Sequence, residues 1–186
     1  MRFDYVIVGA GSAGCALANR LSEDGRYTVA LIEAGPRDTS PWIHIPVGYF
    51  RTMGNPKMDW CYETQEDAGI ANRSIPWPRG RVLGGSSSIN GLLYVRGQAQ
   101  DYDGWAQMGC TGWSWSDVLP YFKRSETWEG ADQTGLRGKS GPLSVQNSRL
   151  TRDVVDKWVD AAVDAGYKRN PDYNGADQEG VGYFQL

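Results

Sequence analysis

The chain opens with the apolar run Tyr5-Val6-Ile7-Val8 and passes at once into Gly9-Ala10-Gly11-Ser12-Ala13-Gly14. A short apolar run of this kind is typical of a parallel strand covered on both faces. Residues 13–21 are small and compatible with a helix, and residues 27–32 form a second apolar run. The order strand, glycine turn, helix and strand predicts the first half of a doubly wound α/β sheet.

The glycine turn has the GxGxxG spacing in the context that nucleotide binding requires, after a strand and opening a helix. Gly9, Gly11 and Gly14 permit a tight turn, close approach of a pyrophosphate and helix–strand packing. The helix N-terminus offers unpaired N–H groups to that anion, and its first turn, with Ser12 and Ala13, carries no carboxylate to repel it. We therefore expect a dinucleotide here, with a purely structural turn as the alternative.

Glu33 ends the second strand nineteen residues after Gly14. At that position an acidic side chain can accept hydrogen bonds from the ribose hydroxyls of a nucleotide. A carboxylate favours a free 2′-hydroxyl over a 2′-phosphate, so NADP is disfavoured. NAD and FAD fit these residues equally well.

A second glycine-rich loop follows in Arg79-Gly80-Arg81-Val82-Leu83-Gly84-Gly85-Ser86-Ser87-Ser88-Ile89-Asn90. Its paired glycines and three serines expose backbone N–H groups and hydroxyls, a surface that suits a phosphate or a ring edge. We expect a helix to begin beside the loop and to add a second helix dipole. A flexible linker is the alternative, and it is disfavoured by Leu83, Ile89 and Leu92-Leu93, which flank the loop closely.

Composition and charge exclude several classes of function. The 186 residues carry a net charge of −3, which gives no basic surface for nucleic acid or an anionic membrane. Three widely spaced cysteines and a single histidine argue against a zinc site and for reduced thiols in a cytoplasmic protein. Met1 stands too close to the first strand for a leader, and no apolar run approaches the length of a membrane span.

The rest of the chain predicts an irregular excursion followed by further elements. Prolines forbid long helices over residues 36–78. Residues 113–126 predict a helix capped by Ser114 or Ser116, residues 142–145 a strand, and residues 151–166 an amphipathic helix. The run from Gly182 to Leu186 is strand-like. Since a sheet needs more strands than these to bury its faces, we expect the chain to continue past Leu186.

With these motifs in view, the chain resembles the glucose–methanol–choline (GMC) oxidoreductases. The loop at residues 79–90, continuing through Gly91-Leu92-Leu93-Tyr94-Val95-Arg96-Gly97, is similar to the first signature of that family. Residues 4–35, ending Leu31-Ile32-Glu33-Ala34-Gly35, resemble its FAD-binding opening. Three further stretches fit, so that the resemblance covers essentially the whole chain: Trp77-Pro78-Arg79-Gly80, Asp101-Tyr102-Asp103 with Trp105, and Gly180-Val181-Gly182-Tyr183-Phe184-Gln185. It is most like bacterial choline-dehydrogenase-like and aliphatic alcohol dehydrogenases.

The resemblance implies a Rossmann-like FAD-binding domain of the p-hydroxybenzoate-hydroxylase type, with a substrate domain over the flavin. We expect the FAD-binding domain to span residues 1–140, with the excursion at 36–78 included. Residues 141–186 would then begin an α+β substrate domain.

The resemblance also implies which residues meet the cofactor. The ADP half would contact Gly11, Ser12, Gly14, Glu33 and Ala34, beside Gly9 and Ala13 of the same turn. The pyrophosphate and isoalloxazine would contact Val82, Gly85, Ser86, Asn90, Gly91, Leu92 and Leu93. Arg79 and Arg81 would neutralise the diphosphate, with surface ion pairing as the alternative. In members that link FAD covalently a histidine occupies the position of Ile89, so we expect non-covalent FAD.

The activity that the resemblance implies is oxidation of a primary alcohol, choline-like or aliphatic or aromatic, to an aldehyde. Hydride would pass to flavin N5, and oxygen or a quinone would accept the electrons. The family's catalytic histidine lies near the C-terminus of a longer chain, so no catalytic residue is assigned within residues 1–186, and His44 is interpreted as structural. The choice of alcohol, a homo-oligomer and peripheral contact of this cytoplasmic protein with the inner membrane stay open.

Two other kinds of protein are kept as alternatives. One is a non-catalytic nucleotide-binding or interaction module. The other is an NAD-dependent enzyme, which the loop at residues 80–90 disfavours because nicotinamide enzymes do not need such a loop.

The remaining conspicuous residues are interpreted as structural. Asp101 and Asp103 would cap the helix through Trp105. The tryptophans would pack the excursion onto the core: Trp42, Trp60, Trp105, Trp113, Trp115 and Trp128.

Overall fold

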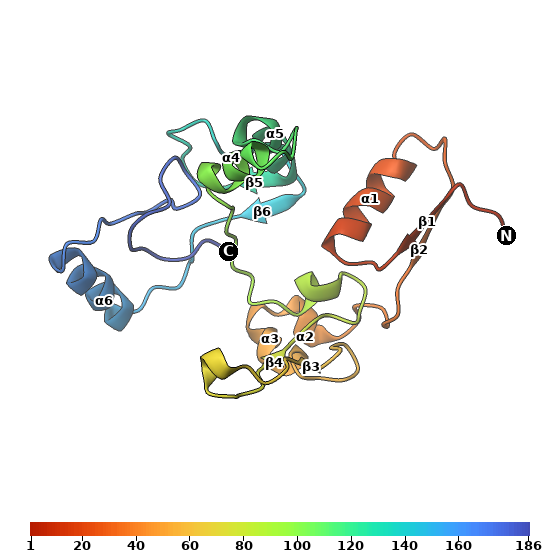
Figure 1. The fold of residues 1–186 in the computed structure, drawn as a ribbon, viewed down its shortest axis with the longest axis horizontal. Helices are drawn as coiled ribbons and strands as arrows, with labels where there is room; N and C mark the ends of the chain where they lie inside the picture. Colours follow the sequence, from red (N-terminus) through yellow and green to blue (C-terminus); the bar gives the residue numbers. More distant parts are fainter. The chain divides into compact units, whose positions relative to one another are not determined.

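The computed structural model describes all 186 residues, which divide into two compact units, Met1–Leu92 and Leu93–Leu186. The first unit contains β1 (Tyr5–Val8), α1 (Ser12–Ser22), β2 (Val29–Ile32), α2 (Pro41–His44), η1 (Pro46–Gly48), α3 (Tyr49–Thr52), β3 (Tyr62–Glu63), η2 (Ala68–Ile70), β4 (Pro76–Trp77) and η3 (Gly85–Ser88) (Figure 1). The second unit contains α4 (Ala99–Gln107), α5 (Trp115–Ser125), β5 (Glu126–Trp128), β6 (Leu143–Val145) and α6 (Asp153–Asp164). A functional boundary after residue 140 stays a prediction.

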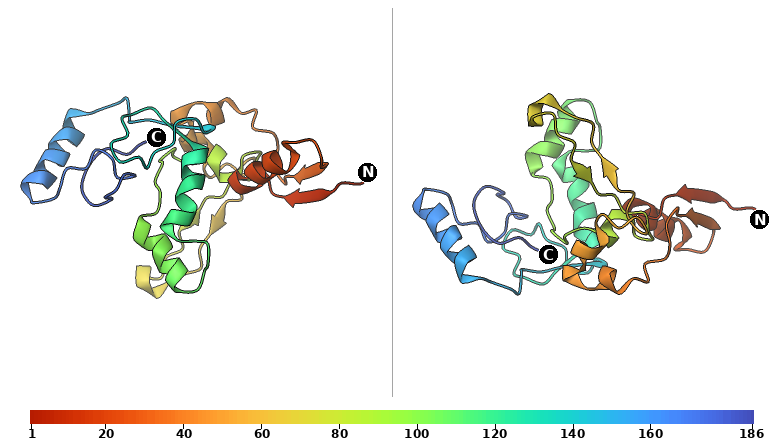
Figure 2. Two further views of the ribbon diagram at one scale, coloured as in Figure 1. Left: turned by 90° about the horizontal axis from the view of Figure 1, so that it is seen from above. Right: turned by 90° about the horizontal axis from the view of Figure 1, so that it is seen from below.

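The strand–turn–helix–strand opening is as predicted. β1 and β2 pair in parallel, residue for residue, and α1 lies beside them (Figures 1 and 2). Ile7 is buried, and its side chain lies next to Gly14 of α1. Val6 and Val8 point to the other face and are 58% and 84% exposed. Within residues 1–186, α1 therefore covers one face of this strand pair, and the other face is exposed.

Residues 36–78 form the irregular excursion that the prolines predict, with helices of no more than four residues and the antiparallel pair β3 and β4. The two ends of the excursion lie together. The Leu83 N–H donates to the Pro36 carbonyl at 3.0 Å, and a Cβ placed on Gly35 would lie 1.9 Å from the Arg81 carbonyl oxygen. The chain therefore leaves the carboxyl end of β2 and returns to the same place.

In the second unit α5 follows the prediction. It begins after Ser114, whose backbone N–H donates to the Asp117 carboxylate at 3.1 Å. The prediction for the preceding helix, α4, is half right. Asp101 accepts from the Gln98 backbone at the start of α4, but Asp103 accepts from the Trp115 N–H and so caps α5 instead.

The strand predicted at 142–145 is β6, which pairs in parallel with β5. The helix predicted at 151–166 is α6. Its expected apolar face is only partly covered, because Val159 is buried whereas Val154 and Trp158 are 73% and 65% exposed. None of the helices of the two units is long and apolar enough to cross a bilayer.

Candidate functional site

The first glycine turn has the geometry that its spacing predicts. Gly9 has φ +96°, in the left-handed region that favours glycine. A Cβ on Gly14 would lie 2.0 Å from the Gly9 carbonyl oxygen, so α1 can approach β1 only because this residue has no side chain. Gly11 is extended, and its carbonyl accepts the first helical bond, from Cys15 at 2.9 Å. At the N-terminus of α1 the turn therefore presents backbone atoms rather than side chains.

The N-terminus of α1 is open to an anion. No side chain caps it, and its first turn contains no acidic residue. Ser12 and Ala13 are exposed, and a groove of about 500 Å³ runs along the turn from Ile7 to Gly14. Unpaired N–H groups at a helix N-terminus carry partial positive charge. The groove is therefore suited to a phosphate.

Glu33 lies just past β2 and is half-buried. Its Oε2 accepts from the Ala10 N–H at 2.8 Å, and its Oε1 accepts from the Gly35 N–H at 2.9 Å. These two hydrogen bonds connect the glycine turn to the end of β2, so Glu33 has a structural role and is not simply a solvent-exposed residue at the end of a strand. Since each carboxylate oxygen has two lone pairs, it retains capacity to accept further hydrogen bonds.

The second glycine loop packs directly on the first, although more than seventy residues separate them in the sequence. Gly84 and Gly85 have φ +93° and +59° in succession. The Gly84 N–H donates to the Ala10 carbonyl at 2.7 Å, and a Cβ on Gly85 would lie 2.8 Å from the Gly11 Cα. The two motifs therefore form one wall, and Gly11, Glu33, Ala34, Gly85 and Ser86 line a common groove of about 500 Å³.

The helix predicted after the second loop is absent. Only the 3-10 turn η3 forms, and residues 89–98 are irregular. Ser87 and Ser88 donate their hydroxyls back to the carbonyls of Gly84 and Leu83, which favours a closed local turn over a helix. The expected second helix dipole is therefore wrong.

The two arginines of the second loop form no ion pairs within residues 1–186. The Arg79 guanidinium lies 5.0 Å from the Trp77 ring, and Nη1 donates to the Pro78 carbonyl. The Arg81 guanidinium lies 5.1 Å from the Trp60 ring, and its Nε is buried without a hydrogen-bond partner. A buried donor without a partner is costly unless a ligand or water satisfies it.

The other predicted residues differ in their exposure. Val82 and Ile89 are buried in a small core with Met58, so Val82 can offer a cofactor only its backbone. Asn90 and Gly91 are exposed. Leu92 has φ +66°, an unusual value for leucine, and its N–H donates to Asn90 Oδ1 at 3.0 Å. Leu93 begins the second unit and is 53% exposed.

The residues present fit a dinucleotide cofactor. The glycine turn leaves an open face, since a Cβ on Gly9 would meet nothing within 4 Å and one on Gly11 would meet only the Gly85 Cα at 4.0 Å. The Arg81 Nε lacks a partner, and Glu33 can accept further bonds. A positive helix end, an arginine and a carboxylate are the groups that a diphosphate and a ribose need.

His44 does not belong to this groove. It is exposed, and its Nε2 lies 2.6 Å from the Asp38 carbonyl oxygen.

Asp59 is buried and accepts hydrogen bonds from the N–H groups of Gly54, Cys61 and Arg79. Burial raises the pKa of Asp59, but the backbone bonds outweigh burial and hold its pKa below the ordinary value.

The second unit is built around buried charges that sequence reasoning missed. Glu126 is fully buried; it pairs with Arg96 at 2.5 Å and with Arg137 at 2.6 Å. The Arg137 guanidinium also lies 4.0 Å from the Trp128 ring. Buried charges are tolerated only when paired and hydrogen-bonded. No periodic pattern marks these residues, since two helices, α4 and α5, lie between Arg96 and Glu126, and a turn-rich segment lies between Glu126 and Arg137.

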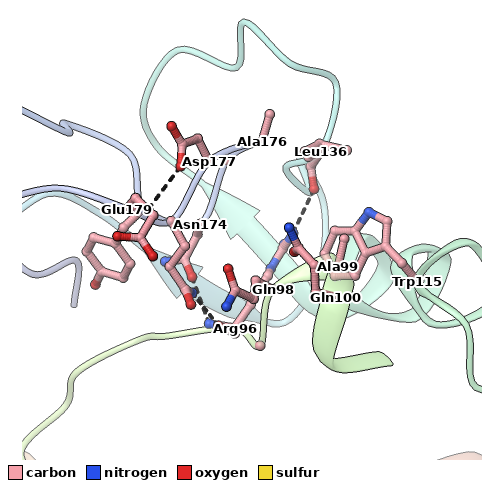
Figure 3. A pocket seen from close by; sticks show the side chains of 14 residues that line it. Arg96, Gln98, Ala99, Gln100, Trp115, Leu136, Asn174, Ala176, Asp177 and Glu179 are labelled. Carbon is pink, nitrogen blue, oxygen red and sulfur yellow. Dashed lines mark hydrogen bonds between the residues drawn. The ribbon is translucent and has the colours of Figure 1, made fainter. Parts of the chain in front are cut away.

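A cavity of about 410 Å³ opens in the second unit beside Arg96 (Figure 3). The Arg96 N–H donates to Asn174 Oδ1 at 2.7 Å, and its carbonyl accepts from Gln178 at 2.8 Å. Asp177 and Glu179 stand on the same segment of the wall (Figure 3). None of the predicted cofactor residues lines this cavity.

The comparison with protein families agrees with the geometry of the first unit. The sequence model of the GMC oxidoreductase family matches residues 3–186. The chain belongs to the GMC oxidoreductase family. The predicted α/β FAD-binding fold is therefore confirmed, and the NAD-dependent alternative is set aside, because the GMC family is FAD-dependent.

Among curated relatives, an oxygen-dependent choline dehydrogenase from Brucella anthropi is 49% identical over 182 residues, which are 98% of this chain and 33% of that protein. The chain thus spans about a third of the length of the curated relatives it matches.

Two solved structures superimpose well on this chain. A pyridoxine 4-oxidase from Mesorbium loti gives a TM-score of 0.91 at 37% identity, covering 100% of this chain and 36% of the other. An FAD-dependent oxidoreductase from Chaetomium thermophilum gives 0.76 at 33% identity, covering 89% of this chain and 30% of the other.

Proposed function

We propose that this chain binds FAD non-covalently in the groove of its first unit. The observation that carries the proposal is the contact between the two glycine loops, which brings the open end of α1, the Glu33 carboxylate and Arg79 to one groove. Ile89 supports the non-covalent mode, because its side chain is buried and has no nucleophilic atom. The residues that would hold FAD are Gly9, Gly11, Ser12, Ala13, Gly14, Glu33, Ala34, Arg81, Val82, Gly85, Ser86, Asn90, Gly91, Leu92 and Leu93.

Each part of the groove has a separate task in this proposal. The N–H groups at the start of α1 hold the pyrophosphate, and the second loop adds further backbone donors. Arg81 compensates the diphosphate charge. Glu33 orients the adenosine ribose through charge-assisted bonds. When bound, FAD supplies the hydride acceptor of the reaction.

We propose further that the whole protein oxidises a primary alcohol, choline-like or aliphatic or aromatic, to the aldehyde, with oxygen or a quinone as electron acceptor. The similarity to oxygen-dependent choline dehydrogenases supports this proposal. The base that takes the hydroxyl proton would lie outside residues 1–186, since His44 is exposed and bonded to a backbone carbonyl. Residues 1–140 would serve FAD, residues 141–186 would begin the substrate domain, and the protein would work in the cytoplasm or at the inner membrane surface.

The test is the cofactor content and reactivity of the intact polypeptide. We expect a purified protein with about one FAD per polypeptide, bleached under anaerobic conditions by choline or another primary alcohol. A variant with Gly14→Ala should lose the flavin, whereas Gly104→Ala, inside α4 where a Cβ would meet nothing within 4 Å, should keep it. A folded, colourless protein that binds no added FAD would overturn the proposal in favour of a non-catalytic module. A flavoprotein that no alcohol reduces would overturn the substrate class alone.

A further inference from the structure

The backbone of Tyr94 is bound on both sides by residues far along the chain. Its N–H donates to the Gln185 carbonyl at 2.9 Å. Its carbonyl accepts from the Tyr173 hydroxyl at 2.8 Å and from Asn174 Nδ2 at 3.1 Å. These donors lie 79 and 80 positions after Tyr94. The place of this peptide is therefore set by tertiary contacts and not by its neighbours in the sequence.

The side chain of Asn174 joins Tyr94 to Arg96. While Nδ2 donates to the Tyr94 carbonyl, Oδ1 accepts from the Arg96 N–H at 2.7 Å (Figure 3). Nδ2 also donates to Gln185 Oε1 at 2.8 Å, and the same oxygen accepts from Arg137 at 2.9 Å. Asn174 is only 3% exposed, so water cannot readily replace these bonds. The amide therefore connects residues 94–96 to the buried charges of the second unit.

Burial alternates along residues 93–96 as it does along a strand. Leu93 and Val95 are 53% and 54% exposed, whereas Tyr94 is half-buried and Arg96 is buried. Successive side chains of an extended segment point to opposite faces. A change of the Tyr94 or Arg96 peptide would therefore turn Leu93 away from the exposed face. Because Leu93 is half exposed, packing within the second unit does not hold it there.

From this arrangement we propose that Asn174 is a positioning residue of the flavin site. It fixes the backbone of Tyr94 and Arg96 and thereby keeps the Leu93 side chain on the face that would contact the isoalloxazine. The inference rests on the proposed FAD binding and adds to it a residue outside the groove of the first unit. An apolar side chain offers contact to a flat ring and nothing to a diphosphate, so Leu93 suits the isoalloxazine end of the cofactor.

The experiment uses the intact polypeptide and compares Asn174→Ala with two further variants. Tyr173→Phe keeps the amide and removes one of the two donors to the Tyr94 carbonyl, so it is a milder form of the same change. Val159→Ala is the control for stability, because it truncates a buried side chain of α6 that takes no part in these hydrogen bonds. Dissociation constants for FAD and ADP are measured by calorimetry. The visible absorption and circular dichroism of the bound flavin report on the surroundings of the isoalloxazine, and urea unfolding reports on stability.

We expect Asn174→Ala to weaken FAD binding by about 3- to 30-fold and to shift the visible spectrum and dichroism of the flavin. ADP binding should be unchanged, because ADP lacks the isoalloxazine. Tyr173→Phe should show the same changes at smaller size. Val159→Ala should lose stability and keep the wild-type FAD affinity and flavin spectrum.

Three results would overturn the positioning role. One is an Asn174→Ala protein that loses stability but keeps the FAD affinity and flavin spectrum of wild type. Another is an equal loss of FAD and ADP affinity in that variant, and the third is a spectral shift of the same size in Val159→Ala. If Asn174→Ala does not fold, Tyr173→Phe decides, and a wild-type spectrum and affinity in it would overturn the role. A wild-type protein that binds no FAD would instead refute the proposed function.

Discussion

Replacing Glu33 by alanine separates two tasks that the structure gives to one carboxylate. In the protein without ligand, Glu33 accepts from the N–H groups of Ala10 and Gly35. Ala10 is fully buried, so its N–H would lose its partner without access to water. Gly35 is only half-buried, and water can replace the lost bond. Most of the stability cost should therefore come from Ala10.

The expected magnitudes follow from these contacts. An orphaned buried N–H costs about 1–3 kcal/mol, which should appear as a lower free energy of unfolding in urea. A lost charge-assisted bond to the ribose costs about 1.5–3 kcal/mol. At about 1.4 kcal/mol per decade, FAD binding should weaken by roughly 10- to 100-fold.

The assay must distinguish loss of the ribose bond from distortion of the turn. Titration with ADP and with 2′-deoxy-ADP does so, because only the ribose hydroxyl differs between them. Wild-type protein should prefer ADP by about tenfold or more, and Glu33→Ala should lose this preference. Glu63→Ala is the control, since it removes an exposed carboxylate on β3 that does not line the groove. If Glu33→Ala kept the wild-type preference, the assignment of Glu33 to the ribose would be refuted.

Four further outcomes are expected. Because Ile89 offers no nucleophile, acid precipitation of the intact flavoprotein should release all flavin; flavin retained in the pellet would contradict this. Asp59→Asn should lower the free energy of unfolding by about 1–3 kcal/mol at pH 7. The pKa of Asp59 is held below its ordinary value. The stability that the Asp59 carboxylate contributes is therefore present above about pH 4 and is lost as pH falls through the lower folded-state pKa. Urea unfolding at pH 7 and in acid should show that the stability difference between wild type and Asp59→Asn shrinks in acid. Gly14→Ala, whose Cβ would lie 2.0 Å from the Gly9 carbonyl oxygen, should separate α1 from β1 and cost about 1–3 kcal/mol; an unchanged melting temperature with full flavin content would argue against close packing there. Glu126→Gln should destabilise the second unit by about 3–5 kcal/mol, because it leaves the buried Arg96 guanidinium without a counter-charge, whereas Arg137 keeps Asp172 at 2.6 Å; a melting curve like that of wild type would mean that water enters the cluster.

The opening of the chain could be predicted because its signals are local. A strand, a glycine turn and a helix follow one another, and Gly9 and Gly14 each need the absence of a side chain for a reason that acts within a few residues. The second loop was harder. Its glycines and serines identify a turn, but the contact between Gly85 and Gly11 depends on where the excursion returns.

The errors of prediction come from contacts distant in sequence. Large aromatic residues usually pack in the core, which predicts a core position for Trp60, yet its N–H donates to the Arg79 carbonyl beside the β3–β4 hairpin and its side chain is 43% exposed. Glu126, Arg96 and Arg137 are polar residues that would normally be assigned to the surface. Only their mutual neutralisation, across two helices for Arg96 and across a turn-rich segment for Arg137, allows them to be buried.

The closed neck of the excursion, where Pro36 and Gly35 meet Leu83 and Arg81, makes residues 36–78 an exchangeable module. Closing a longer loop costs only about 0.6 kcal/mol for each doubling of its length, and the neck itself anchors both ends. Excursions of different length can therefore be transplanted between relatives without moving the phosphate-binding turn, provided that the residue at position 58 keeps the apolar contact of Met58 with Val82 and Ile89. In such chimaeras the affinity for the diphosphate should equal that of the protein that supplies the glycine turn, because the turn lies outside residues 36–78.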